Sequence, residues 1–440
     1  MKFIWLFFFW SLCFGSSAQF NVPDWSFNAT IYEVNVRQFS QEGSFSAFQK
    51  ELPRLKQMGV DIIWLMPIHP IGEKNRKGSL GSYYAVKDYT EINPEFGTKS
   101  DFQNLVQEIH RLDMKIIIDW VANHSSPDNT WVEVEHHKDW YTLDSTGNLQ
   151  PTIGTDWWDV ADLNYDNYEM RNRMIASMKY WVKEFDIDGF RCDVASWVPI
   201  DFWVDARNEI ESVKQIFFLA EAEGEEMYKA FDMTYGWEFH HILNDIAKGN
   251  KTTKDIHNFF KKNNNSAYIQ MHFTSNHDEN SWNGTVHERL GDARFACAVI
   301  AATIDGMPLV YNGQETSLDK RLAFFEKDSI DWSKMDLVDF YTKLLTLKRS
   351  HPALQHGSDG GGLEFFTLPE NPNVLIYCRT NGKRRLVALI NLSDQASEIV
   401  ISEPRLKGFY KSLFSSQKIK LRKKNNKIKL EAFAYKILYS

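Results

Sequence analysis

The sequence is poor in cysteine. Its 440 residues contain four, Cys13, Cys192, Cys297 and Cys378, which lie far apart along the chain. Two of the last three stand in apolar runs, where a thiol packs like a small hydrophobic side chain. The pattern does not indicate a disulfide framework, and we expect buried free thiols instead.

Long hydrophobic runs are also absent. The longest covers residues 3–14, whereas a helix needs ~20 apolar residues to span a bilayer. Lys2 precedes this run and small residues ending at Ala18 follow it, an order typical of a secretory signal peptide. We therefore expect residues 1–18 to be removed, export to the periplasm or the cell exterior, and no membrane span. Lipidation of Cys13 is the alternative, which the bulky residue before it disfavours.

The chain has no excess of basic residues. Its 50 lysines and arginines and 58 aspartates and glutamates give a formal net charge of −8. A mildly acidic protein has no electrostatic reason to bind nucleic acid, and a neutral ligand requires no net charge. One basic run, residues 418–429, alternates lysine with apolar residues around Asn425–Asn426, which predicts a hairpin with one solvated face.

Aromatic residues, in contrast, are abundant. They make up 14% of the chain and include 15 tryptophans, within a hydrophobic fraction of 43%. We expect most of these rings to pack in the core. A minority is expected to line a sugar-binding cleft, because aromatic faces stack well on the C–H faces of pyranose rings.

Short apolar runs alternate with longer amphipathic stretches over most of the chain. The expected strands are Ile31–Val36, Ile62–Met66, Lys115–Asp119, Gly189–Asp193, Phe217–Glu221, Phe231–Thr234, Gln270–Thr274 and Leu309–Tyr311. The expected helices include Phe45–Met58, Lys99–Arg111, Met170–Glu184, Phe202–Val213, Arg289–Ile304 and Leu337–Arg349. Eight strands that are each followed by a helical pattern predict an α/β fold, a closed (β/α)₈ TIM barrel.

Two segments depart from this alternation. Residues 124–163 are polar, rich in tryptophan and without a long helix, which predicts an excursion from the barrel after the third strand. From residue 356 onward, a glycine cluster gives way to period-two alternation, which predicts an antiparallel β-sandwich. The expected organisation is a signal peptide at 1–18, a barrel at 19–123 and 164–355, an inserted domain B at 124–163 and a C-terminal domain at 356–440.

Four of the expected strands lead into an acidic residue. These acids are Asp119, Asp193, Glu221 and Asp278, the last of which follows Asn276 and His277. The carboxyl ends of the strands of a (β/α)₈ barrel converge on one face, where residues assemble the active site. One such acid could be a helix cap or a turn residue, but four are better explained by a shared site.

A pair of carboxyl groups suits retaining glycoside hydrolysis, which needs a nucleophile and a proton donor about 5 Å apart. Arg191 lies two residues before Asp193 and therefore on the same face of the strand, where it would keep that carboxylate ionised. Glu221 has no adjacent cation in the sequence, which favours a raised pKa and a proton-donor role. Asp278, next to His277, could stabilise positive charge on the sugar.

These residues stand in a series of motifs. They are Asp119-Trp-Val-Ala-Asn123-His124, Gly189-Phe-Arg191-Cys-Asp193, Phe218-Leu-Ala-Glu221, Phe273-Thr-Ser-Asn276-His277-Asp278, Gly81-Ser-Tyr-Tyr84-Ala-Val-Lys-Asp88-Tyr89 and Ala161-Asp162-Leu163-Asn164. With all of them, in this order, the chain resembles the α-amylase family of glycoside hydrolases over nearly its whole length after residue 18.

The resemblance implies a role for each motif residue. It implies Asp193 as nucleophile, Glu221 as general acid/base and Asp278 as transition-state stabiliser, with Tyr84, His124, Arg191 and His277 around the sugar that is cleaved. It also implies that Asn123 and Asp162 match two ligand positions of the calcium ion that many members bind. Asp119 is expected to be structural. Glu223, Glu225 and Glu226, which lie beyond the strand in an expected solvated loop, are the rivals of Glu221 for the acid role.

Three positions differ from the pattern of many α-amylases. Ser196 and Trp197 replace a lysine–histidine pair after the nucleophile, and Ser82 replaces a histidine before the stacking tyrosine. The expected activity is hydrolysis of α-1,4-glucosidic bonds in an α-glucan oligosaccharide or polysaccharide. The alternatives are an exo-acting α-glucosidase, a cyclomaltodextrinase-like enzyme, a transglycosylase, or a glucan-binding protein without catalysis. The oligomeric state is left open.

Overall fold

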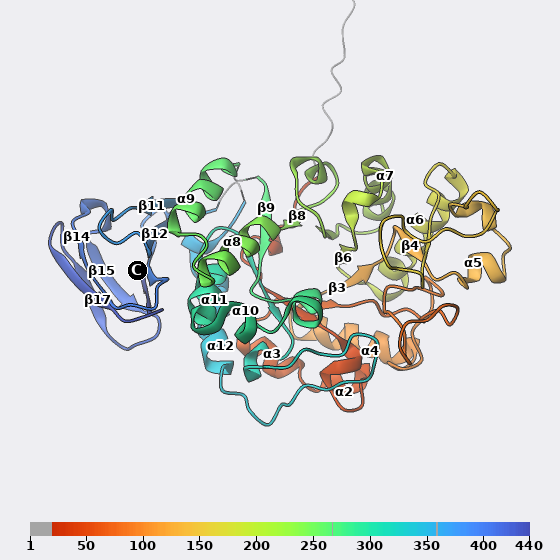
Figure 1. Ribbon diagram of the computed structural model, residues 1–440, viewed down its shortest axis with the longest axis horizontal. Helices are drawn as coiled ribbons and strands as arrows, with labels where there is room; N and C mark the ends of the chain where they lie inside the picture. Colours follow the sequence, from red (N-terminus) through yellow and green to blue (C-terminus); the bar gives the residue numbers. More distant parts are fainter. Residues whose placement is uncertain (1–19, 266, 358–359) are drawn as a thin grey trace, which may run out of the picture.

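Eight parallel strands form a closed barrel in the computed structural model, which describes residues 20–265, 267–357 and 360–440 (Figure 1). The strands are β1 Ile31–Val34, β2 Ile62–Leu65, β3 Lys115–Trp120, β6 Gly189–Cys192, β7 Phe217–Ala220, β8 Met233–Tyr235, β9 Ile269–His272 and β10 Met307–Tyr311. They close in the order β1-β10-β9-β8-β7-β6-β3-β2. The predicted (β/α)₈ barrel is therefore confirmed.

The strands are buried on both sides, which explains why the sequence shows them as continuous apolar runs. Ile31, Ile62, Ile117 and Leu219 belong to a buried cluster contributed by the barrel strands. Neighbouring strands pair in parallel register, for example Ile31 with Ile62 and Ile62 with Lys115. This register brings the residues at the carboxyl ends of the strands to one face of the barrel.

Helices surround the strands, with ends close to the predicted ones. The longer helices are α3 Leu52–Met58, α4 Lys99–Arg111, α6 Tyr168–Phe185, α7 Ile200–Glu211, α8 Trp237–Ala247, α9 Thr253–Lys262, α11 Arg294–Thr303 and α12 Val338–Ser350. The short ones are α1 Val36–Phe39, α2 Phe45–Gln49, α5 Thr130–Glu133 and α10 Val286–Leu290. Single turns are η1 Asp24–Ser26, η2 Lys138–Trp140, η3 Ala195–Trp197, η4 Glu225–Lys229, η5 Glu279–Asn283, η6 Gly291–Ala293, η7 Gln314–Thr316, η8 Pro352–Leu354 and η9 Pro404–Leu406.

Two helix predictions need correction. The predicted helix 45–58 is divided into α2 and α3, and Pro53 lies in the first turn of α3, where it needs no backbone N–H partner. The predicted helix 289–304 begins later, at Arg294, after α10 and a short turn. Within the described residues, no helix is both long and apolar enough to cross a membrane. The predicted signal peptide lies outside the described residues.

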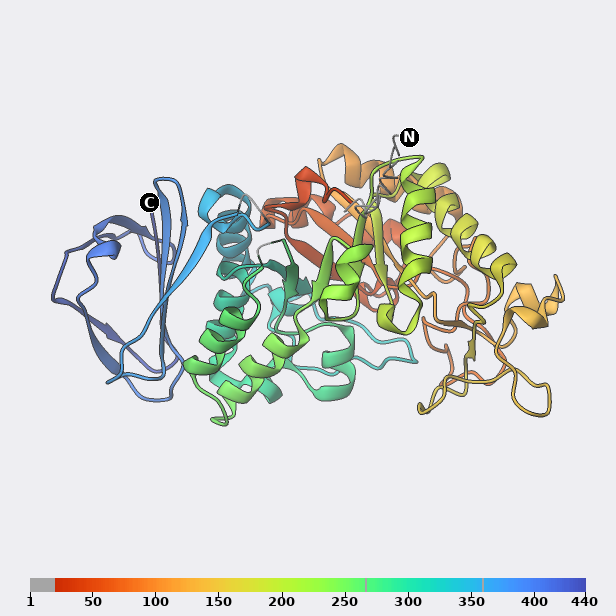
Figure 2. The same cartoon turned by 90° about the horizontal axis from the view of Figure 1, so that it is seen from above.

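Residues 124–163 leave the barrel after β3 and form a separate lobe at one end of the molecule (Figures 1 and 2). The lobe is closed at its base by an antiparallel ribbon of β4 His124–Ser125 and β5 Ala161–Asp162. Between these strands it contains only the four-residue helix α5 and the short turn η2. His124 and Asp162 are therefore fixed as direct partners across the ribbon.

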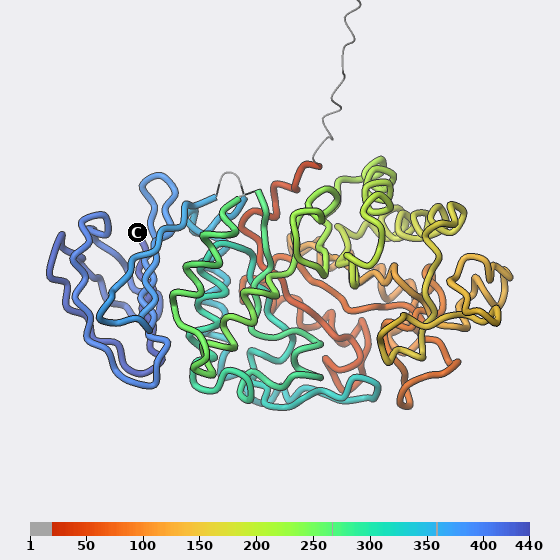
Figure 3. The backbone as a smooth tube through the Cα atoms, turned by 45° about the horizontal axis from the view of Figure 1, so that its top comes forward, coloured from red at the N-terminus to blue at the C-terminus, as the bar shows by residue number. Residues whose placement is uncertain are grey.

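The C-terminal residues form two antiparallel sheets at the opposite end, beside the green and cyan helices of the barrel (Figure 3). The strands are β11 Gly362–Phe366, β12 Val374–Asn381, β13 Arg384–Asn391, β14 Ser397–Ile401, β15 Gly408–Ser412, β16 Lys418–Leu421, β17 Asn426–Leu430 and β18 Tyr435–Tyr439. The larger sheet has the order β11-β12-β13-β18-β15-β16, and β14 pairs with β17. Apolar residues of both sheets share one core.

The hairpin predicted for residues 418–429 is wrong. β16 pairs with β15, whereas β17 pairs with β14 of the other sheet. Both strands alternate polar and apolar residues. This pattern predicts which face of each strand is buried, but it does not identify the partner strand. The side chain of Asn426 binds the backbone of both Ile401 and Arg422 and thereby holds the crossing between the sheets. Cys192, Cys297 and Cys378 are buried free thiols, as predicted.

Candidate active site

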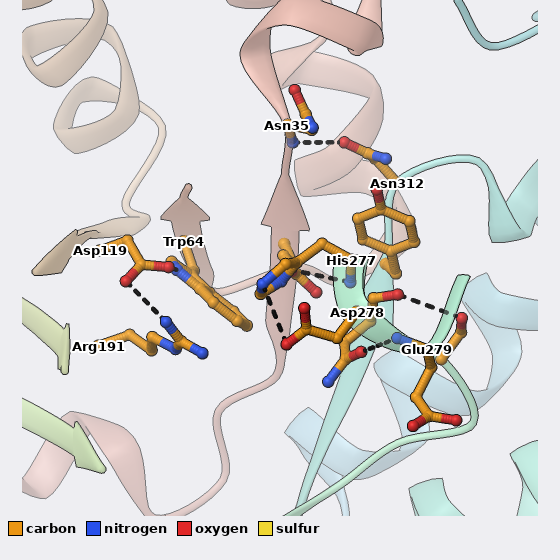
Figure 4. Close-up of polar contacts among 12 residues, drawn as sticks. Asn35, Trp64, Asp119, Arg191, His277, Asp278, Glu279 and Asn312 are labelled. Atoms are coloured by element: carbon orange, nitrogen blue, oxygen red, sulfur yellow. Dashed lines mark hydrogen bonds and ion pairs between the residues drawn. The ribbon is translucent and has the colours of Figure 1, made fainter. Parts of the chain in front are cut away.

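Three of the predicted carboxylates meet at one guanidinium group. Arg191 is fully buried, and its Nη1 lies 2.8 Å from Asp119 Oδ1 and 3.1 Å from Asp193 Oδ1. Its Nη2 lies 2.8 Å from Glu221 Oε1. The three acids come from the ends of β3, β6 and β7, which are neighbours in the barrel. Figure 4 shows the contact between Arg191 and Asp119.

The prediction that Glu221 has no cation beside it is therefore wrong. Arg191 is thirty residues away in the chain, but β6 and β7 pair with Arg191 opposite Leu219, two residues before Glu221. The pKa of Glu221 is nevertheless raised, because burial disfavours its charged form more than Arg191 favours it. The raised pKa of Glu221 was predicted. Its cause is burial, which outweighs the lowering effect of Arg191.

Asp193 also differs from the prediction. Arg191 lowers its pKa, as expected, but burial and the neighbouring Glu221 carboxylate raise it well above the usual range. Because Asp193 and Glu221 are close and both buried, they titrate as a pair. A proton held by Glu221 removes the repulsion that otherwise disfavours ionised Asp193.

The loop after β6 binds Glu221 directly. Val194 has a φ of 36°, which a β-branched side chain rarely adopts. In this conformation its N–H donates to Glu221 Oε2 at 2.9 Å, and the N–H of Ala195 donates to the backbone oxygen of Glu221. Strain of this kind costs about 1–3 kcal/mol and persists where the surroundings enforce it. The loop thus fixes the position of Glu221 relative to Asp193.

His277 occupies the other side of the barrel mouth. Its Nδ1 lies 2.5 Å from Glu33 Oε1, and its Nε2 lies 2.7 Å from the Tyr84 hydroxyl and 3.4 Å from Asp278 Oδ2. Burial alone would lower the pKa of His277, but Asp278 and Glu33 raise it to about 9. The imidazole is therefore positively charged at neutral pH. Figure 4 shows His277 and Asp278 joined by this contact.

Tyr84 connects the two halves of the site. Its ring stacks on His277, with centroids 5.5 Å apart and planes 20° apart. Its hydroxyl group donates to Asp119 Oδ2 at 3.1 Å, and Trp64 Nε1 donates to the same oxygen at 3.3 Å. Glu33 and Trp64 were not predicted as site residues. The signal for Glu33 was a lone acid inside an apolar strand.

His124 lies at the base of the excursion. Burial lowers its pKa to about 3, so its ring is neutral at physiological pH. Its ring centroid is 5.4 Å from that of Trp157, which stacks at 5.5 Å on Trp197. Trp197 is 50% exposed. Trp157 was not predicted as a site residue, because nothing in the sequence distinguishes it from the other tryptophans of this lobe.

The two predicted calcium ligands are bound to each other. Asn123 Nδ2 donates to Asp162 Oδ1 at 3.3 Å, and the Thr152 hydroxyl group donates to the same oxygen. Their backbone oxygens already accept hydrogen bonds from Leu163 and Thr142. Calcium takes six to eight oxygen ligands, of which Asn123 and Asp162 would supply two, and in this arrangement the two side chains are hydrogen-bonded to each other. No group of three acidic, histidine or cysteine residues suited to a metal occurs among the described residues.

Comparison with known proteins places this site in context. Residues 26–339 match the model of the α-amylase catalytic domain, and residues 365–437 match that of the maltogenic amylase C-terminal domain. A noncanonic maltogenic α-amylase of Thermotoga neapolitana is 32% identical, with a TM-score of 0.85 over 94% of this chain and 98% of that one. An α-amylase of Lactobacillus plantarum is 31% identical, with a TM-score of 0.84 over 94% of this chain and 99% of that one.

The resemblance extends to curated sequences. α-Amylase 2 of Dictyoglomus thermophilum is 26% identical over 443 residues, which cover 90% of this chain and 74% of the relative. The family model alone matches well over half of the chain, and it includes every predicted catalytic residue. The chain therefore belongs to the α-amylase family of glycoside hydrolases, which act on α-glucans.

Proposed function

We propose that this enzyme hydrolyses α-1,4-glucosidic bonds in maltodextrins or starch with net retention of configuration. Asp193 is the nucleophile, Glu221 the general acid/base and Asp278 the stabiliser of the transition state. The observation that carries the proposal is that Asp193 and Glu221 contact the two terminal nitrogens of one buried guanidinium. Two carboxyl groups held this close match the geometry of a retaining enzyme.

The first step needs one proton on this pair. With the proton on Glu221, Arg191 stabilises the ionised form of Asp193. A carboxylate oxygen of Asp193 then attacks the anomeric carbon, while Glu221 protonates the glycosidic oxygen. The departing sugar leaves with the electron pair of the broken bond, now as a hydroxyl group. Positive charge that develops on the ring is stabilised by Asp278.

The second step reverses these roles. Glu221, now a carboxylate, takes a proton from water as the water oxygen attacks the same carbon. The ester bond to Asp193 breaks, and its electron pair returns to the carboxylate. Two inversions at one carbon give net retention. An acceptor sugar in place of water gives transglycosylation instead.

Aromatic residues define the side of the leaving group. Glu221 protonates the leaving oxygen, and the loop that binds Glu221 through Val194 continues directly into η3 and Trp197. We infer that the exposed ring of Trp197, which stacks on Trp157, lies on the side of the departing sugar. Stacking on these rings takes the place of the hydrogen bonds from the lysine–histidine pair of many α-amylases. Such stacking would hold a sugar acceptor in the site after the leaving group departs. This supports transglycosylation as a side activity.

Substitution of the nucleophile tests the reaction. We expect Asp193→Asn to lower kcat/KM on maltoheptaose by at least about 10³-fold while oligosaccharide binding, measured by calorimetry, is kept. Glu223→Gln is the matched control, because Glu223 accepts a hydrogen bond from the backbone N–H of Glu238 and contacts none of the three acids at Arg191. Wild-type rates in the Asp193 variant would show that Asp193 is not the nucleophile, whereas a wild-type protein that binds maltoheptaose without cleaving it would be a glucan binder.

We also propose that the enzyme is exported and loses residues 1–18. The support is the order of a positive charge, a short apolar run and small residues at the start of the chain. A relative 25% identical over 394 residues is named an intracellular maltogenic amylase, so the two locations are real alternatives. The mass of the protein recovered from the native host should correspond to a chain that begins at Gln19. A full-length chain in the cytoplasmic fraction contradicts export.

A further inference from the structure

Glu33 is a buried carboxylate beneath the active site with an unusual set of contacts. It lies in β1 and is fully buried. Its Oε1 accepts the hydrogen bond from His277 Nδ1 at 2.5 Å and lies 3.4 Å from the backbone nitrogen of His277. Its Oε2 has no hydrogen-bond partner within the described part of the chain. The contacts of Glu33 are thus directed at one residue of the site.

Such a carboxylate is costly to bury, because an isolated charge loses its hydration and one of its oxygens gains nothing in return. Burial raises the pKa of Glu33, whereas His277 and Arg191 lower it. A glutamine of the same shape could accept the same hydrogen bond without this cost. What the carboxylate adds over a glutamine is its negative charge beside His277.

His277 gains a defined state from this contact. Because Nδ1–H donates to Glu33, the other nitrogen, Nε2, is directed toward Tyr84 and Asp278 at the site. With the ring charged, Nε2 also carries a proton and is a donor. With the ring neutral and Nδ1 still protonated, Nε2 becomes an acceptor. The charge on Glu33, together with that on Asp278, therefore favours the state in which His277 offers a proton and not a lone pair to the sugar site.

We propose that Glu33 is a positioning residue that keeps His277 doubly protonated, so that Nε2–H donates into the active site during glucan cleavage. Glu33 touches His277 and not the substrate, and it acts through that ring. The proposal rests on the proposed function only for the kinetic part of its test. The protonation state of His277 can be measured without any reaction.

Other charges face this pair, and the test must allow for them. The ionisable or charged groups around His277 are Glu33 on β1, Tyr84 after β2, Asp119 on β3, Arg191 on β6, Glu221 after β7 and Asp278 after β9. Those around Glu33 also include Tyr235 on β8 and Tyr311 on β10. Asp278 favours a charged imidazole, and Arg191 opposes it. Removal of Glu33 alone therefore shifts the balance without abolishing the effect of Asp278.

The experiment combines histidine NMR with a pH profile. In enzyme labelled on histidine, the His277 signals are identified by their absence in His277→Gln. We expect wild-type His277 to stay protonated at pH 7.5 and Glu33→Gln to lower its pKa by at least about one unit, which corresponds to about tenfold in kcat/KM on the alkaline side. Because the variant regains the proton at lower pH, its kcat/KM should approach that of the wild type at pH 5.5.

Glu315→Gln is the matched control. Glu315 is equally buried and accepts a hydrogen bond from the Tyr32 hydroxyl at 2.5 Å, but it pairs with Arg54 and not with His277. This variant should leave the His277 titration and the pH profile unchanged. A loss of activity in Glu33→Gln that is the same at every pH would mean a structural role only and would overturn the proposal.

Two further results distinguish failure of this proposal from misfolding of the variant and from failure of the proposed function. If Glu33→Gln does not fold, the wild-type measurement still decides, because a His277 that is neutral at pH 7.5 overturns the proposal. If Asp193→Asn retains wild-type activity, the proposed function fails, but the coupling of Glu33 to His277 can still be read from the NMR titration. An unchanged titration in Glu33→Gln, with Asp193→Asn inactive, rejects the positioning role alone.

Discussion

Arg191 is the residue on which the catalytic arrangement depends. It is fully buried, yet Asp119, Asp193 and Glu221 all contact it. The planar guanidinium presents its donors in a fixed fork, so it can bind several carboxylates at once, as a lysine could not. The same contacts keep three negative charges close together in a dry site. Without this cation, like charges would repel, and the pair that carries the reaction would separate.

Trp197 is the residue expected to set the balance between water and sugar as acceptors. We expect Trp197→Ala to lower the ratio of transfer to hydrolysis on maltotetraose by about two- to twelvefold, because a stacking contact of about 0.5–1.5 kcal/mol is lost on the leaving-group side. The measurement is the product profile by chromatography.

Trp158, which follows Trp157 in the sequence, provides a control for this prediction. Trp158 is exposed to a similar degree, but its ring packs over Lys77 at 4.4 Å, whereas the partner of Trp197 is Trp157. Trp158→Ala should therefore leave the transfer ratio unchanged. An equal effect of both substitutions would mean that aromatic surface in general, and not this stacked pair, holds the acceptor.

Strand β6 begins at a glycine that the barrel requires. A Cβ atom at Gly189 would lie 1.9 Å from the backbone oxygen of Phe217 in the neighbouring strand β7. Because this contact is with backbone, the two strands would have to move apart. We expect Gly189→Ala to destabilise the protein by roughly 3–5 kcal/mol, as severe strain or overpacking does. Urea unfolding followed by circular dichroism measures this loss.

Gly362 serves as the comparison for this substitution. It begins β11, and the nearest atom to a Cβ there is 3.9 Å away. Gly362→Ala should change the free energy of unfolding by no more than about 0.5 kcal/mol. A Gly189→Ala variant as stable as Gly362→Ala would show that β6 and β7 separate without cost.

At the level of elements, the sequence predicted those strands and helices whose burial pattern is regular. α4 is found at Lys99–Arg111 as predicted, with a capping box at Thr98 and Asp101. α8 and α9 are not among the helices named from the sequence, although Thr252 and Asp255 form a capping box at the start of α9. The pairing of β16 with β17 was predicted wrongly. Alternation shows which face of a strand is buried, but it does not name the partner strand.

At the level of the whole molecule, the fold class could be predicted because eight apolar runs in succession leave few alternatives. The catalytic acids could be predicted because parallel strands carry their ends to one face. The contact between Arg191 and Glu221 could not, since it depends on which strands are neighbours and how they are aligned. The same holds for Glu33, whose role depends on His277, a residue 244 positions away.

The closure of the barrel has a consequence for how the chain is made. β1 pairs with β10, and Ile31 lies opposite Leu309. During synthesis, one edge of β1 therefore remains without its partner until most of the chain has emerged. Contacts between such distant residues slow folding, and open strand edges invite association with other chains. Refolding of this enzyme should therefore be slow and sensitive to protein concentration, and a chaperone that shelters the edge of β1 would improve its yield.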